Sequence, residues 1–286
     1  LSNAAVAVLT KAEAASLSAA DVGAMSASQV GAFSTGAFSG LTAQAVAAFS
    51  TTQLAALSGS QIASLNPAGL TAAEIAALSG SQTQALTATQ LNALGAAALN
   101  AVKTANLTAT QAASLSTTAV AGLTAAQIAA LPNAAVAALT RNEAASLSAA
   151  DVAAMSGGQV GALSNTAIAG LTATAAAALS STQIAALSST QTQALTTSQL
   201  NALSATALAA LPLAQLSNTQ LGGLSGGALA AMGTALDAKL SATQLGALSS
   251  SAIVSLTTTQ IGALSTAQIA GLTAAEIGKL SAAQAK

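Results

Sequence analysis

The chain has 286 residues, of which 53% are hydrophobic, 1% aromatic and 5% charged, with six basic and seven acidic side chains. Ordinary soluble domains contain roughly 25% charged residues and anchor their cores on bulky aromatic side chains, so a large conventional globular core is excluded. The near balance of charge also leaves no basic surface that would neutralise phosphates, and we expect no nucleic-acid partner.

The sequence also limits membrane insertion and cysteine chemistry. A membrane-spanning helix needs about 18 consecutive apolar residues, whereas polar residues interrupt this chain every few positions, so we expect no membrane span. The absence of cysteine excludes disulfides and thiolate metal sites. The opening residues 1–4, Leu-Ser-Asn-Ala, lack a signal-peptide pattern and are typical of a mature protein or an internal fragment.

An apolar residue recurs every eight positions along the chain. One run extends from Leu9 to Leu65, and another from Leu107 to Leu211. A second apolar residue, such as Ile128, follows five positions later in most units. The consensus octad is L-[ST]-x-x-[QEA]-[IVL]-x-A. Such short-period self-similarity predicts a modular array that grows by stacking, as solenoids do.

The octad register slips by five residues at three places, near 65–70, 102–107 and 211–216. Five is the longer internal step of the octad, so we interpret each slip as one extra half-unit. Composition does not change at any slip, and we predict a single continuous octad-repeat array over residues 1–286.

A longer duplication lies over the octads. Residues 9–22 return almost intact at 139–152, and residues 82–87 return at 191–196. The offset between the copies falls from 130 to 109, so the second copy has lost 21 residues, which is two octads and one slip. This indicates that the array gains and loses whole blocks.

The octad predicts a short capped helix. In the unit that starts at Leu123, Thr124 is a suitable N-cap and Gln127 falls at N3, which together make a capping box. Leu123 and Ile128 then occupy the two positions of the hydrophobic staple. Ala at the other positions favours helix, and the next cap follows so soon that each helix should last about two turns.

One continuous helix is a poor alternative. At about 100° per residue, the apolar stripe would drift roughly 80° with every octad, and no fixed face would be buried. The prolines agree with frequent breaks, because Pro67 fits N1 behind an Asn66 cap, while Pro132 and Pro212 stand at unit junctions.

A β-solenoid is the stronger alternative, since short repeats rich in Ser, Thr and Leu also build those. Strands favour period-two alternation and β-branched residues, whereas this chain is rich in Ala and alternates steps of five and three. We therefore predict an all-α superhelical solenoid with one very short capped helix per octapeptide.

The sequence offers little chemistry. It contains no His, Cys, Tyr or Trp, which excludes the usual nucleophile triads and His-based or Cys-based metal sites. The six carboxylates in the Gln position of the octad fit helix N-termini better than acid catalysis; they are Glu13, Asp21, Glu74, Glu143, Asp151 and Glu276. We predict no catalytic, cofactor-binding or metal-binding residues and no enzyme activity.

The L-[ST]-x-x-Q-[IV]-x-A-L units resemble the low-complexity octapeptide arrays of large bacterial secreted surface proteins, which are described as adhesins or filament proteins. This resemblance implies a non-enzymatic, extracellular or cell-surface role. Our first hypothesis is a self-assembling filament or fibre subunit with a weakly charged Ala/Ser/Thr-rich surface. The alternative is a stalk or adhesive repeat region that binds polysaccharide, other surfaces or ice.

Overall fold

The computed structural model describes residues 1–233 and 240–285. These residues form short helices joined by extended junctions, and no β-strand occurs among them. The predicted all-α fold is confirmed, and the β-solenoid alternative is wrong for this described part of the chain.

The chain divides into two compact units, Leu1–Ala138 and Leu139–Lys286. The first unit contains α1 (Asn3–Ala7), α2 (Lys11–Ala15), α3 (Ala19–Gly23), α4 (Ala27–Ala32), α5 (Thr35–Phe38), α6 (Ala43–Val46), α7 (Thr51–Ala55), α8 (Gly59–Ser64), η1 (Pro67–Gly69), α9 (Ala72–Ala77), α10 (Gly80–Ala85), α11 (Ala88–Ala93), α12 (Ala96–Asn100), η2 (Thr104–Asn106), α13 (Ala109–Ala113), α14 (Thr117–Gly122), α15 (Ala125–Ala130) and α16 (Asn133–Ala137). The prediction of one unbroken array over residues 1–286 remains a prediction.

The second unit has the same kind of organisation. It contains α17 (Arg141–Ser146), α18 (Ala149–Ala154), α19 (Gly157–Ala162), α20 (Asn165–Gly170), α21 (Ala173–Ala176), α22 (Ser181–Ala185), α23 (Ser189–Ala194), α24 (Thr197–Ala202), α25 (Ala205–Ala210), η3 (Leu213–Gln215), α26 (Asn218–Gly222), α27 (Gly226–Ala231), α29 (Ala242–Leu245), α30 (Ser250–Ile253), α31 (Thr258–Ala263), α32 (Thr266–Ile269) and α33 (Ala274–Ile277).

The octad at 123–130 shows how the sequence produces each helix. Thr124 has an extended backbone, with φ −76° and ψ 155°, and its hydroxyl accepts from the Gln127 N–H at 3.2 Å. The Thr124 N–H in turn donates to Gln127 Oε1 at 3.0 Å. These two bonds form the predicted capping box. Leu123 and Ile128, which we assigned to the hydrophobic staple, are both buried.

The α-helices are shorter than the octad pattern suggested. They contain four to six residues, as α21 and α15 illustrate, which is between one and two turns. The expected length of about two turns was too long because both junction residues leave the helix. Leu131, for example, ends α15 with φ −61° and ψ 136°, and the next residue, Pro132, is also extended.

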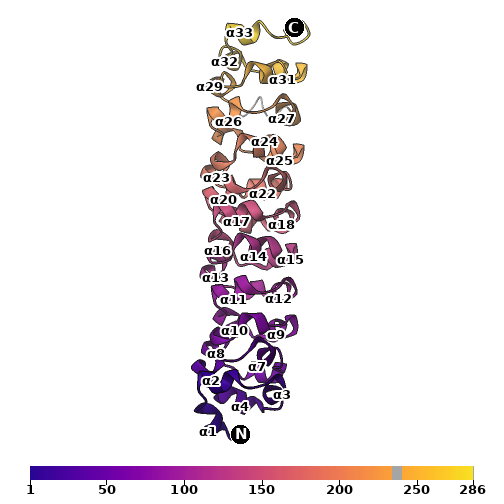
Figure 1. Cartoon of the computed structure of the whole chain (residues 1–286). Helices are drawn as coiled ribbons and strands as arrows, with labels where there is room; N and C mark the ends of the chain where they lie inside the picture. Colours follow the sequence, from indigo (N-terminus) through magenta and orange to yellow (C-terminus); the bar gives the residue numbers. More distant parts are fainter. Residues whose placement is uncertain (234–239, 286) are drawn as a thin grey trace. The chain divides into compact units, whose positions relative to one another are not determined.

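Helices three places apart in the chain pack on each other. In the first unit α1 packs on α4, α2 on α5 and α3 on α6; in the second, α17 packs on α20, α18 on α21 and α19 on α22. Three helices therefore complete one solenoid turn, and successive turns stack within a unit (Figure 1). Each unit is a solenoid of very short capped helices.

The three register slips form the 3-10 helices η1, η2 and η3. The predicted Asn66 cap with Pro67 behind it opens η1. η1 packs on α6 and α11, and η2 packs on α10 and α15, in each case three places away. A slip is therefore a shortened unit that replaces a whole octad, not an added half-unit. The 21 residues lost after the duplication equal two octads and one shortened unit, which is one complete solenoid turn.

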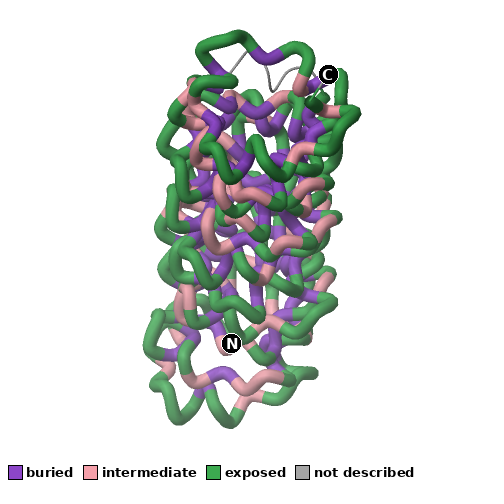
Figure 2. The backbone as a smooth tube through the Cα atoms, turned by 90° about the horizontal axis from the view of Figure 1, so that it is seen from above, coloured by how far each residue is buried: buried purple, intermediate pink, exposed green. Residues whose placement is uncertain are grey.

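The core of each unit is formed by the two apolar positions of the octad, and buried and exposed stretches alternate along the backbone (Figure 2). Burying one Leu contributes roughly 1.5–3 kcal/mol, and this gain recurs with every octad. The three Phe residues of the chain gather in the first unit, where the Phe38 ring lies 5.4 Å from Phe33 and 6.1 Å from Phe49.

Stacked turns approach so closely at some glycines that a side chain there would collide with the neighbouring turn. A Cβ on Gly170, at the end of α20, would collide with the backbone carbonyl of Arg141 on α17, whereas a Cβ on Gly262 within α31 would meet nothing within 4 Å. We expect G170A to lower the free energy of unfolding by about 1–3 kcal/mol through overpacking. G262A should raise it by about 0.5–1 kcal/mol by restricting the unfolded chain. Urea unfolding of both variants checks this pair, and equal effects would contradict it.

Candidate functional site

The recurring polar feature of the fold is a Gln side chain at N3 that makes two kinds of hydrogen bond. In α24 the Thr196 N–H donates to Gln199 Oε1 at 2.7 Å, which closes the capping box. Gln199 Nε2 donates to the carbonyls of Ile168 at 2.8 Å and Leu171 at 2.7 Å, at the end of α20. We call this arrangement a glutamine bridge. It joins the start of one helix to the end of a helix one turn earlier.

Glutamine bridges recur in both units with a fixed spacing. Where a turn holds three octads, the acceptor carbonyls lie 28 and 30 or 31 residues earlier, and where it holds a shortened unit, they lie 25 and 28 residues earlier. Gln260 differs, because its acceptors lie 27 and 31 residues earlier. Bridges to two carbonyls are made by Gln53, Gln61, Gln82, Gln90, Gln111, Gln127, Gln183, Gln191, Gln199, Gln220, Gln260 and Gln284. The spacing shows that a shortened unit removes three residues from a turn without disturbing the bridge.

The sequence analysis found the cap but missed the bridge. A capping box accepts Glu or Gln equally, because only the side-chain oxygen takes part. The carbonyls of the preceding turn require a donor, and only the amide of Gln supplies one. The preference for Gln over Glu at the fifth octad position was the signal that could have predicted this second role.

Other polar side chains serve the shortened units and their neighbours. Lys103, just before η2, donates from Nζ to the Leu78 carbonyl at 3.0 Å, and Thr104 donates to the Gln127 carbonyl at 2.6 Å. Asn92 accepts from the Ser116 N–H at 2.7 Å and donates to the Ser114 carbonyl at 2.8 Å. These side chains also link successive turns, and the sequence analysis did not single them out.

The six carboxylates in the Gln position all lie at N3 of a capping box, as predicted; they are Glu13, Asp21, Glu74, Glu143, Asp151 and Glu276. The structure does not bring them together, because each closes its own helix. No group of three or more His, Cys, Asp or Glu side chains suited to a metal ion occurs among residues 1–233 and 240–285. None of the helices within these ranges has the length and hydropathy of a membrane span.

Glu74 occupies the N3 position of a glutamine bridge but lacks the amide that would donate to the preceding turn. Its side chain is 3% exposed, and Oε2 accepts from the Thr71 N–H at 2.6 Å, but Oε1 is buried without a hydrogen-bond partner. By the spacing of Gln82 and Gln90, Glu74 faces the carbonyls of the preceding turn, to which a carboxylate cannot donate. Burial raises the pKa of Glu74, and the bonds from Thr71 offset this only in part.

Glu13 and Asp21 differ from Glu74 because they are exposed. The backbone N–H and hydroxyl of Thr10 donate to Glu13 Oε2, each at 2.8 Å, and lower its pKa. The hydroxyl and N–H of Ser18 do the same for Asp21, at 2.6 and 2.9 Å. Their contribution to stability is present above the ordinary pKa of these groups and is lost as the pH falls through the lowered values.

Comparison with known proteins agrees with a repeat architecture. Residues 238–274 match the ALTTAQ repeat. Within this range, residues 263–268 read Ala-Leu-Ser-Thr-Ala-Gln, and Ser265 and Gln268 form a capping box. The same octad register continues outside the matched range, as at Thr124 and Gln127. The chain is thus a repetitive short-helix protein with an ALTTAQ repeat in part of its length.

A solved structure of a leucine-rich repeat-containing protein, LegL7 from Legionella pneumophila, aligns with 70% of this chain and 80% of its own at 11% identity, with a TM-score of 0.22. No curated protein matches the sequence.

Removing a bridge should destabilise the unit that contains it. Q199A leaves two buried carbonyls without a donor and opens the capping box of α24, so we expect a loss of about 1–3 kcal/mol in the free energy of unfolding. Gln193 is exposed, and within residues 1–233 and 240–285 its amide donates only to the Gln215 carbonyl, at 3.1 Å. Q193A is the matched control and should change stability by less than about 0.5 kcal/mol. Equal losses in urea unfolding would show that the bridge is not stabilising.

Replacing Glu74 by Gln should restore the missing bridge. We expect E74Q to raise the free energy of unfolding at neutral pH by about 1–3 kcal/mol, because a buried unpaired oxygen becomes a donor. A raised pKa in the folded state means that wild-type stability falls as the pH rises above the ordinary Glu value of about 4.3. The difference between E74Q and wild type should therefore widen between about pH 4 and neutrality. A pH-independent difference in thermal unfolding would contradict this assignment.

Proposed function

We propose that this chain is a structural subunit of an extracellular filament or cell-surface fibre that assembles through its weakly charged surface. The proposal rests on the positions of the few charged side chains. Of the described carboxylates, Glu74, Glu143, Asp151 and Glu276 are buried, although composition alone would place them outside. Six charged side chains remain exposed among the described residues, so the exposed face is as sparsely charged as the whole sequence, of which 5% is charged.

A surface of this kind favours association. The exposed octad positions carry mainly Ala, Ser and Thr, so two copies meet little electrostatic repulsion and lose little side-chain entropy on contact. The exposed charged side chains of the described residues are Lys11, Glu13, Asp21, Lys103, Arg141 and Lys279. The resemblance to secreted surface arrays supports an extracellular location, and the absence of His and Cys side chains supports a non-enzymatic role.

A second candidate is an adhesive stalk that binds polysaccharide or another hydrogen-bonding surface. Paired hydroxyls on stacked helices favour it: Ser180 lies 2.9 Å from Thr182 at the start of α22, and Ser204 lies 3.1 Å from Thr206 at the start of α25, which packs on α22. All four of these hydroxyl-bearing residues are exposed. A stalk should remain a monomer in the absence of its ligand, whereas a fibre subunit should assemble alone.

Charging the surface tests the fibre proposal. Thr190, Ser198 and Thr206 are exposed N2 residues on three consecutive helices and so lie on all three sides of one turn. Carboxylates near a helix N-terminus are favourable, so T190E/S198E/T206E should keep its helical circular dichroism. We expect wild type to form filaments visible by electron cryo-microscopy, and the acidic variant to form at least tenfold fewer.

The neutral variant T190Q/S198Q/T206Q is the matched control, because it adds side chains of similar size without charge, and it should assemble like wild type. Wild-type protein that stays monomeric at all concentrations in sedimentation velocity would overturn the fibre proposal. Binding of such monomers to polysaccharide would favour the stalk.

A further inference from the structure

Glu74, in the first turn of α9, is a buried carboxylate that no side chain of opposite charge balances. It is the only charged residue between positions 22 and 102, so α7 and α12, which pack on α9, and η1, which precedes it, contain none. Lys103 is the nearest basic residue in the sequence, and its Nζ donates to the Leu78 carbonyl, at the other end of α9. Burying an ion without a partner is costly, so this carboxylate needs a proton or a cation.

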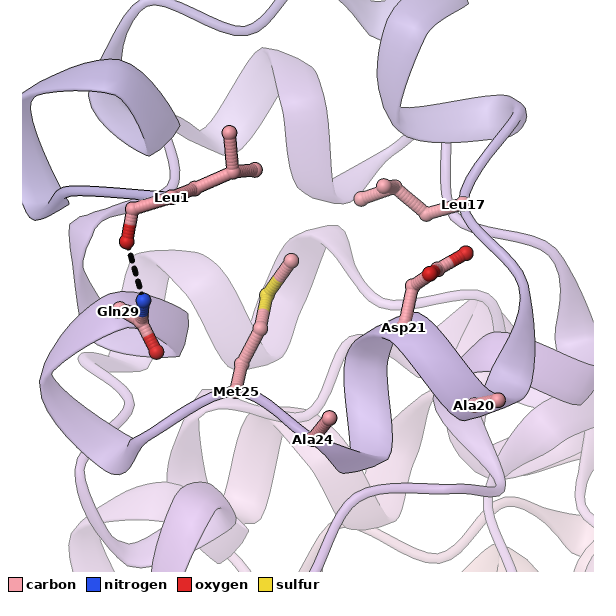
Figure 3. Close-up of a pocket in the computed structure, with 7 residues that line it drawn as sticks. All are labelled: Leu1, Leu17, Ala20, Asp21, Ala24, Met25 and Gln29. Carbon is pink, nitrogen blue, oxygen red and sulfur yellow. Dashed lines mark hydrogen bonds between the residues drawn. The ribbon is translucent and has the colours of Figure 1, made fainter.

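The bridge spacing identifies the atoms that face Glu74. In an ordinary bridge an amide donates across the turn, as Gln29 Nε2 does to the Leu1 carbonyl, 28 residues earlier (Figure 3). The turn before α9 holds the shortened unit η1, so the spacing of 25 and 28 residues assigns Glu74 to the carbonyls of Phe49 and Val46. Within residues 1–233 and 240–285, the Val46 carbonyl accepts only the Phe49 N–H, at 3.1 Å, and the Phe49 carbonyl accepts no hydrogen bond.

Packing of the backbone holds these oxygen atoms in place. η1 packs on α6, which ends at Val46. A Cβ added to Gly69, in η1, would lie 2.6 Å from Val46 Cβ, so the two segments are already in close contact. The Thr71 N–H binds Glu74 Oε2 at 2.6 Å, which leaves the buried Oε1 for the carbonyls. The result is a group of three acceptor oxygens without a donor.

A positive charge suits this group better than a single proton. Lys103 shows that the carbonyl at a helix end accepts a cation in this fold, because its Nζ lies 3.0 Å from the Leu78 carbonyl, 25 residues earlier, which is the bridge spacing of a shortened unit. A proton on Glu74 would serve only one of the two carbonyls, since a carboxyl group has one O–H. A bare cation contacts all three oxygens, and carbonyl oxygens can replace the hydration shell of K⁺.

We propose that Glu74 Oε1 and the carbonyls of Val46 and Phe49 bind a monovalent inorganic cation, K⁺ or Na⁺. One carboxylate balances one positive charge, so the bound pair is neutral. Ca²⁺ takes about six to eight oxygen ligands, and no group of three or more Asp, Glu, His or Cys side chains occurs in the described part of the chain. The cation takes the place of the missing amide and joins α9 to the end of α6.

Thermal unfolding followed by circular dichroism at about pH 8 tests this site. Replacing about 150 mM choline chloride by the same concentration of KCl or NaCl keeps the ionic strength constant. The unfolding midpoint of wild type should rise by at least about 4 °C in one or both salts. E74Q has its own amide donor and should shift by less than about 1 °C. The control E13Q removes an exposed carboxylate of another capping box and should keep the response of wild type.

Protons compete with the cation for the same carboxylate. Burial raises the pKa of Glu74, so the response of wild type to K⁺ or Na⁺ should weaken as the pH falls through that raised value. Equal shifts in wild type and E74Q would mean a general salt effect and would overturn the site. Stability of wild type that responds to pH but to neither salt would also overturn it, because a proton alone would then neutralise Glu74.

Discussion

A helix of four to six residues leaves most of its backbone N–H and C=O groups without an intrahelical partner, and the rest of this structure depends on how those groups are satisfied. The Ser or Thr cap serves the first amides, as Thr196 does in α24. At many helix ends the Gln of a later turn donates to the free carbonyls, as Gln199 does to Ile168 and Leu171. One side chain thus satisfies both helix ends, and isolated short helices become mutually dependent turns.

This dependence explains the modularity of the sequence. The bridge needs only a fixed spacing to the preceding turn, so a shortened unit such as η1 changes that spacing from 28 to 25 residues without breaking it. It also explains why 21 residues could be lost from the duplicated block, since removal of one complete turn leaves every remaining bridge in register.

The sequence predicted the local structure well because capping is local. Thr124 and Gln127 are three residues apart, and their bonds follow from known cap preferences alone. Local rules do not predict the packing of helices three places apart or the role of η1 as a shortened unit. They also do not predict that Gln127 Nε2 donates to carbonyls 25 and 28 residues earlier in the chain. Glu74 shows the same limit, because a carboxylate is an ordinary N3 residue and only the packed turn leaves its Oε1 buried and unpaired.

The most direct test of this account is hydrogen exchange of the Gln side-chain amides, measured by NMR in the folded protein. The Nε2 protons of Gln183 and Gln199, which donate to two buried carbonyls each, should exchange at least a hundredfold more slowly than those of the exposed Gln193. Protection of this size would establish that the amides hold successive turns together in solution. Equal and fast exchange for all three would contradict the bridge and leave the solenoid to apolar packing alone.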